Sequence, residues 1–149
     1  MIKIIVFSVL IFCLKVSFAQ GNDLILQIEN IEGENGNIMI AVFDNEADFR
    51  TKENPIYKDS LIVNGSNLKS TFKSIPQGIY AIAIYHDENS DGKLNTAKLG
   101  IPTEGVGFSG KTKNLNKKPK FDDSVFELGS DTTIYINMIY KKKKDENKD

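Results

Sequence analysis

The densest cluster of polar chemistry in this chain is the stretch HDENSDGKLN, which begins at its single histidine. Calcium takes about six to eight oxygen ligands, and carboxylates and amides at alternate positions of a tight loop supply them compactly. Counted from Asp87, the first, third and fifth places hold Asp87, Asn89 and Asp91, and a glycine follows at the sixth. This matches the start of a D-x-[DN]-x-[DN]-G calcium loop. We therefore expect Ca²⁺ as the ligand, with Lys93 offering its backbone carbonyl and Asn95 a side-chain oxygen.

The stretch departs from an EF-hand in two ways. The twelfth place holds Lys98 instead of a bidentate glutamate, and the preceding segment is strand-like instead of helical. A missing carboxylate would have to come from elsewhere in the chain, and the candidates are Glu104, Asp122 and Asp123. The alternative is a plain turn, in which the Asp and Asn side chains only bind nearby backbone groups.

His86 has two possible roles. A zinc site needs three or four nitrogen or sulfur ligands, which the chain does not supply. His86 could be a packed, hydrogen-bonded residue at a strand end, which is the role we favour. Alternatively, in a metal-assisted hydrolase, a cation held by Asp87, Asp91 and Glu104 would activate water while His86 transfers protons. We favour a non-enzymatic protein and leave enzymatic activity open.

The first 19 residues are typical of a secretory signal peptide. Lys3 precedes an apolar stretch, and the small residues Ser17 and Ala19 suit a signal peptidase. The stretch is shorter than the roughly 20 apolar residues that span a bilayer, so we expect no transmembrane span. Cleavage after Ala19 removes the only cysteine and takes the formal charge from −1 to −3. We therefore expect an exported protein, periplasmic or extracellular, without disulfides and without the basic character of a nucleic-acid-binding protein.

The remaining chain has the alternation of β-strands and little sign of helix. Apolar residues alternate over 24–28 and 132–140, the run 38–43 is apolar throughout, and residues 79–85 are apolar on both faces, as in a central strand. Asn64-Gly65 between two strand-like runs predicts a hairpin. One helical turn is expected around Ala47 and Phe49.

These segments predict an all-β domain over residues 20–140, a single antiparallel β-sandwich of about seven strands, prealbumin- or immunoglobulin-like. A long loop follows the central strand, because residues 87–124 show no periodicity. Within it, GVGFSG lacks the strand–helix context of a dinucleotide site, so its glycines predict hinges or close backbone contacts. Residues 141–149 form a charged tail, for which we expect a solvated end.

Two segments resemble a known family. They are GIYAIAIYHDENSDGKLNTAKLGIPTEGVGFSG and, further on, KPKFDDSVFEL. They are similar to a family of bacterial exported domains of unknown function, with the motifs HDEN-x-[DN]-GKL-[DN]-T, GIP-x-EG-x-GFS and P-x-F-x-[DE]. The resemblance covers residues 23–140, with departures at Asn95 and Ser124. It implies one exported β-sandwich domain in which the acidic stretch, Glu104 and the Asp122/Asp123 pair belong to one unit, and it carries no established activity.

The sequence therefore predicts a binding or structural module of the bacterial cell envelope with a calcium-ordered loop. Its partner could be a glycan, a peptide or an envelope protein. Phe108, Phe121 and Phe126 could either anchor the long loop in the core or line an exposed groove, and we favour the core.

Overall fold

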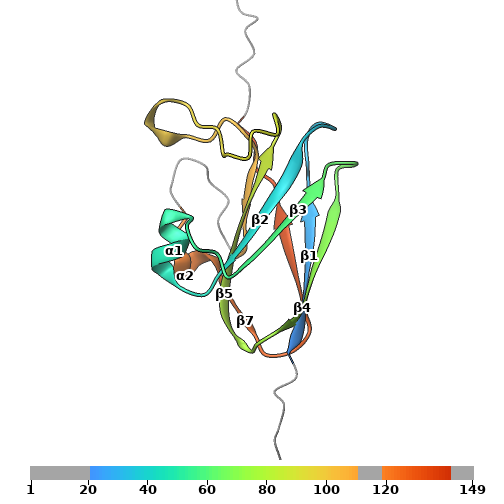
Figure 1. Cartoon of the computed structure of the whole chain (residues 1–149), viewed down its shortest axis with the longest axis vertical. Coiled ribbons are helices and arrows are strands. Elements are labelled where there is room, and N and C mark those ends of the chain that lie inside the picture. Colours follow the sequence, from blue (N-terminus) through green and yellow to red (C-terminus); the bar gives the residue numbers. More distant parts are fainter. Residues whose placement is uncertain (1–20, 111–118, 142–149) are drawn as a thin grey trace, which may run out of the picture.

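The computed structural model describes residues 21–110 and 119–141, which form two packed β-sheets (Figure 1). The predicted signal peptide and most of the charged tail lie outside the described residues. The strands are β1 (Asn22–Glu29), β2 (Asn37–Phe43), β3 (Tyr57–Ile62), β4 (Leu68–Ile75), β5 (Gly78–Asp87), β6 (Val106–Phe108), β7 (Val125–Leu128) and β8 (Thr132–Asn137). The helical segments are α1 (Glu46–Thr51), η1 (Lys98–Gly100) and α2 (Phe121–Ser124). The predicted all-β sandwich is confirmed.

One sheet has the strand order β4-β1-β8, and the other has the order β3-β2-β5-β6. β5 is central as predicted, because β2 occupies one of its edges while β7 and then β6 share the other. Every paired strand is antiparallel except β1 and β8, which run parallel along residues 24–29 and 132–137. The antiparallel prediction is therefore wrong for this pair.

The main core lies between the two sheets and is built from alternate residues of each strand. From β1 it takes Leu24, Leu26 and Ile28, and the inward residues of β2 and β5 face them. Fully burying such side chains contributes about 1.5–3 kcal/mol each, so the alternation in the sequence accounts for much of the stability of the sandwich.

A second, smaller core lies on the outer face of the larger sheet. Phe43 and Ala81 on this face contact Phe49 of α1, and Phe121 of α2 packs against the same group. In Figure 1 both helices lie on the same side of that sheet. α1 begins where the Asn45 side chain accepts a hydrogen bond from the Asp48 amide, as a helix N-cap does. The predicted core role is confirmed for Phe121 and Phe126, which pack against the second and the main core, whereas Phe108 has both predicted roles, since it packs against the second core and also lines a groove.

The predicted hairpin at Asn64-Gly65 is wrong. β3 pairs with β2 and β4 pairs with β1, so the turn carries the chain from one sheet to the other. Neither turn residue has the positive φ that a tight two-residue hairpin would require. The local signal marks the turn correctly, but long-range packing decides which strands pair.

The short strand β6 was not predicted, and Gly107 shows why it forms. A Cβ atom at Gly107 would lie 2.7 Å from a methyl group of Ile136 and 2.9 Å from Ile84, so only glycine lets β6 approach the core this closely. The neighbouring Ser109 is fully buried, and its hydroxyl accepts a hydrogen bond from the Ile82 amide and donates to the Ser124 carbonyl. The glycine-rich stretch is therefore a close backbone contact, one of its two predicted roles.

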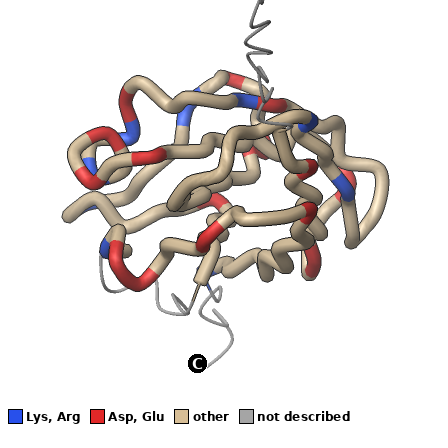
Figure 2. The backbone as a smooth tube through the Cα atoms, turned by 90° about the horizontal axis from the view of Figure 1, so that it is seen from below, with Lys and Arg blue, Asp and Glu red and all other residues tan. Residues whose placement is uncertain are grey.

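Charged residues of both signs are interspersed along the described backbone (Figure 2). Within residues 21–110 and 119–141, no helix is long and apolar enough to cross a membrane.

Candidate binding groove and acidic loop

The segment from residue 88 to residue 105, which joins β5 to β6, is here named the acidic loop, and Asp87 organises its first half. Asp87 ends β5 and is only 2% exposed. Its Oδ1 accepts a hydrogen bond from the Asp91 amide at 3.0 Å, and its Oδ2 accepts one from the Gly92 amide at 2.8 Å. Gly92 has φ +77°, a left-handed conformation that favours glycine. One buried carboxylate therefore fixes the turn.

Glu104 closes the acidic loop from its other end. It is 5% exposed, and its Oε1 accepts a hydrogen bond from the Glu88 amide at 3.1 Å. Its Oε2 accepts one from the Asn95 amide at 2.7 Å. Hydrogen bonds to charged groups are each worth about 1.5–3 kcal/mol. Glu104 therefore acts as a clamp that holds the start of the acidic loop, at residue 88, close to its middle, at residue 95.

The solvent side of the loop carries a third, exposed group of contacts. Oδ1 of Asp91 accepts from the Lys93 amide at 2.9 Å, and Oδ2 accepts from the side-chain amides of Asn95 at 3.0 Å and Asn89 at 3.2 Å. The hydrogen bonds from Asn95 and from the Lys93 backbone hold the pKa of Asp91 below its ordinary value. The carboxylate is thus held in its charged form.

The structure brings some of the predicted metal ligands together and leaves others apart. It gathers Asp87, Asn89, Asp91, Lys93, Asn95 and Glu104 in one hydrogen-bonded loop. It does not bring Asp122 and Asp123 there, because they lie in α2. The strand that follows α2 pairs with β5 at Ala81, about 20 Å along the strand from Asp87.

The carboxylates of Asp87, Asp91 and Glu104 accept hydrogen bonds from backbone amides, and Asp91 also accepts from two side-chain amides. Across residues 21–110 and 119–141, no three His, Cys, Asp or Glu side chains are grouped to hold a metal ion. Hydrogen bonds within the chain thus account for the loop's shape. Calcium binding stays a prediction.

His86 has the packed role predicted for it. It is 1% exposed, with Nε2 2.7 Å from the Asn35 carbonyl oxygen and Nδ1 2.9 Å from the Tyr140 hydroxyl. Because a carbonyl can only accept, Nε2 donates to it, and Nδ1 is paired with the tyrosine hydroxyl. Burial raises the pKa of Tyr140 to about 12, so this hydroxyl keeps its proton at neutral pH. Both ring nitrogens of His86 therefore serve structure.

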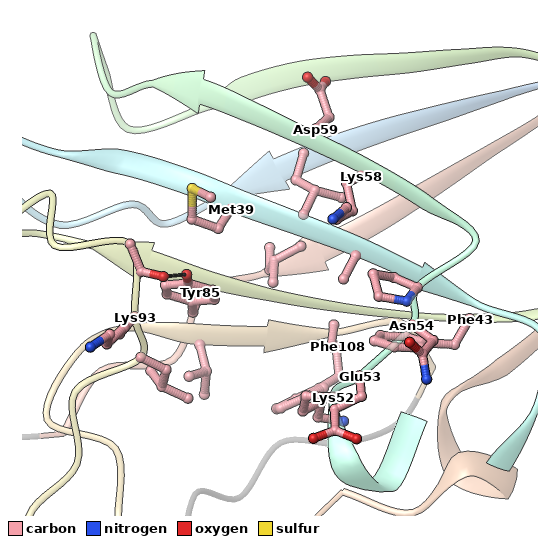
Figure 3. A pocket seen from close by; sticks show the side chains of 18 residues that line it. Met39, Phe43, Lys52, Glu53, Asn54, Lys58, Asp59, Tyr85, Lys93 and Phe108 are labelled. Atoms are coloured by element: carbon pink, nitrogen blue, oxygen red, sulfur yellow. Dashed lines mark hydrogen bonds between the residues drawn. The ribbon is translucent and has the colours of Figure 1, made fainter. Parts of the chain in front are cut away.

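A groove of about 700 Å³ lies beside the acidic loop on the outer face of the larger sheet. We call it the outer groove (Figure 3). Its floor is formed by apolar side chains of three neighbouring strands, namely Met39 and Ala41 of β2, Ala83 and Tyr85 of β5, and Phe108 of β6. Residues 52–55, after α1, form one wall, and residues 92–94 of the acidic loop form the other. The Tyr85 hydroxyl donates to the Gly92 carbonyl at 3.0 Å, which ties that second wall to the floor.

Sequence reasoning offered Phe108 as a groove-lining residue, as the alternative to a core role, but did not find the rest of this groove. Its floor comes from positions that the apolar pattern marks as buried, and no local signal tells which part of the outer face α1 and α2 leave uncovered. One signal was available for the wall, because Phe49 and Lys52 are three positions apart at the end of a short helix, where side chains meet.

The fold and the outer groove define a small β-sandwich domain with a groove that is walled on one side by the acidic loop. The chain matches the model of the family described as "Uncharacterized protein conserved in bacteria (DUF2141)" over residues 26–135, and it belongs to that family. Neither the comparison with curated proteins nor the comparison with solved structures found a match.

Proposed function

We propose that this domain is an exported binding module of the bacterial cell envelope and that it takes a small apolar ligand into the outer groove. The observation that carries the proposal is the groove itself, whose floor is apolar and whose second wall is held by the Asp87 and Glu104 carboxylates. Its volume lies within the range of about 300–1,000 Å³ that is typical of small-molecule sites.

The groove favours a small molecule over the glycan, peptide or envelope protein expected from the sequence. The floor presents few polar groups for sugar hydroxyls or a peptide backbone, since it consists of Met39, Ala41, Ala83, Tyr85 and Phe108. The second wall is already fixed before a ligand binds. Binding therefore does not lose the conformational entropy that ordering a mobile loop would cost. Export is supported by the signal-peptide character of residues 1–19.

The hydrolase alternative is less well supported. It requires His86 to exchange protons with a reacting water, whereas both nitrogens of His86 are hydrogen-bonded inside the domain. A general base must lie within hydrogen-bond reach of the proton that it takes. The buried position of His86 supports binding as the function.

Calcium binding by the acidic loop is a separate part of the proposal. Hydrogen bonds gather the side chains of Asp87, Asn89, Asp91 and Asn95 in one loop, which supports it. An ion at a hundred times its dissociation constant would stabilise the domain by about 2.7 kcal/mol. Thermal melting in chelator, in calcium and in magnesium tests this, and equal melting temperatures in all three would remove calcium from the proposal.

Binding in the groove can be tested with a neutral naphthylamine fluorophore, whose emission rises in apolar surroundings. We expect saturable binding with a dissociation constant on the order of micromolar. Ala41→Trp fills the floor of the groove and should weaken binding at least tenfold, at about 1.4 kcal/mol per factor of ten. The matched control Ala97→Trp lies on the exposed acidic loop, outside the residues that line the groove, and should leave binding unchanged. Equal binding by both variants would contradict the proposal.

A further inference from the structure

Lys52 stands at the end of the outer groove in an aromatic setting. It caps the C-terminus of α1 in a left-handed conformation, with φ +63°, and its backbone amide donates to the Asp48 carbonyl. The residue as a whole is exposed, but its side chain folds back over the second core. The same residue lines the groove.

The amino group of Lys52 is fixed by aromatic rings. Nζ lies 3.4 Å from the ring centroid of Phe49, 5.4 Å from that of Phe108 and 5.7 Å from that of Phe43. Two of these rings, Phe43 and Phe108, line the groove as well. A cation within about 6 Å of a ring centroid is attracted by the ring face. Nζ also donates a hydrogen bond to the Phe49 carbonyl.

The charges around the groove are mostly positive, although the domain as a whole is acidic. Lys58 and Lys93 line it together with Lys52. Asp59 is directed away, because its carboxylate accepts hydrogen bonds from the Ser70 hydroxyl and from its neighbour's amide, and Figure 3 shows its side chain pointing away from the groove. Glu53 is the acidic side chain that remains on the wall.

We propose that Lys52 is an anion-recognising residue and that the ligand of the outer groove is a small amphiphile with an apolar chain and a terminal carboxylate. This inference rests on the proposed function and names its ligand class. The apolar chain of the ligand lies on the floor of the groove between Met39, Ala83 and Phe108, and the ligand's carboxylate contacts the ammonium group of Lys52.

Two properties of Lys52 suit this role. An ammonium group has three N–H donors, and the carbonyl and the ring of Phe49 occupy two sides of it, which leaves a donor for a ligand oxygen. Burial lowers the pKa of Lys52 to about 8, so the amine is still mostly protonated at neutral pH. A partly desolvated ammonium group gains more from a carboxylate than a fully hydrated one does.

The competing explanation is that Lys52 only caps α1. A cap would account for its bond to Phe49, since cations are favourable at helix C-termini, but it would give no preference between charged and neutral ligands. The two explanations therefore differ in a binding measurement.

The experiment compares decanoate with 1-decanol, which share a chain and differ in charge, by displacement of the neutral fluorophore from the whole domain. We expect decanoate to bind about tenfold more tightly than decanol to the unmodified protein. Lys52→Met should abolish that preference by weakening decanoate binding about tenfold relative to decanol. Lys52→Arg, which keeps the charge, should retain most of it. Lys69→Met, at an exposed lysine of β4 in the other sheet, is the matched control.

The outcomes separate this inference from the proposed function. If decanoate and decanol bind equally and Lys52→Met changes neither, the groove binds apolar ligands but the role of Lys52 is wrong. If neither compound displaces the fluorophore, or the fluorophore itself does not bind, the proposed function fails and this inference fails with it. A loss of preference in Lys69→Met equal to that in Lys52→Met would show a general charge effect and would also overturn the inference.

Discussion

The clamp formed by Glu104 can be tested by replacing one atom. In Glu104→Gln the side chain keeps its shape and one acceptor oxygen, but the second oxygen becomes an NH₂ group. The carboxylate now accepts from the amides of Glu88 and Asn95, at 3.1 Å and 2.7 Å. An amide can satisfy only one of them and directs a donor at the other.

The expected cost follows from these two bonds. Losing one charge-assisted hydrogen bond in a buried position removes about 1.5–3 kcal/mol, and the facing donors add to this. Burying a neutral amide in place of a charge returns part of that loss. We expect a net decrease of about 2–3 kcal/mol in the free energy of unfolding, which for a domain of this size lowers the melting temperature by roughly 10 °C.

Thermal melting and limited trypsin digestion together report this change. Lys93 and Lys98 in the acidic loop are trypsin sites, so a loosened loop should be cleaved faster there. The matched control is Glu88→Gln, because the Glu88 side chain is exposed and only its backbone amide contacts Glu104. If Glu104→Gln melted within about 2 °C of the unmodified protein and resisted trypsin equally, the clamp would be unimportant.

Two further predictions concern packing and pH. Gly107→Ala places a methyl group 2.7 Å from Ile136 and should destabilise the domain by about 1–3 kcal/mol in chemical denaturation, whereas Gly65→Ala, with no atom within 4 Å, should be close to neutral. The folded-state pKa of Lys52, about 8, lies below the ordinary lysine value of 10.5, so the unfolded chain binds more protons between these values and stability should rise with pH. We expect a gain of about 1–2 kcal/mol between about pH 8 and 10, after allowing for solvent screening. Above that range the raised pKa of Tyr140 acts in the opposite direction. Lys52→Met should remove the rise, and an equal rise in both proteins would contradict the assignment.

β1 and β8 were predictable from the sequence because their side chains alternate between more buried and more exposed positions. The run around Ile82 was apolar on both faces, and β5 is indeed covered on both, by the opposite sheet and by α1 with α2. The pairing of β3 and β4 was not predictable from Asn64-Gly65, since a turn signal is local while the choice of sheet depends on distant partners. β6 was missed because three residues around Gly107 are too few to show a period.

The acidic loop shows how far residue types can lead. Its sequence predicted a tight turn at Gly92 and the involvement of Glu104, and both lie where the loop is held. The sequence could not show whether the carboxylates turn towards an ion or towards backbone amides, because an ion site and a hydrogen-bonded turn need the same oxygens at the same spacing. The prediction of Asp122 and Asp123 as metal ligands used only their residue type. They lie in α2, because the strand that follows α2 pairs with β5.

The parallel pairing of β1 with β8 has a consequence for how the domain folds. β1 is the middle strand of its sheet, and one of its two neighbours is β8, the last strand among the described residues. That sheet stays incomplete, with one edge of β1 open, until β8 has been synthesised. Closing so long a segment is slow, so we expect folding in milliseconds to seconds and a late step that joins the two ends. Until β8 arrives the smaller sheet cannot complete the core, and an incompletely packed polypeptide is the kind that can be threaded through a narrow channel.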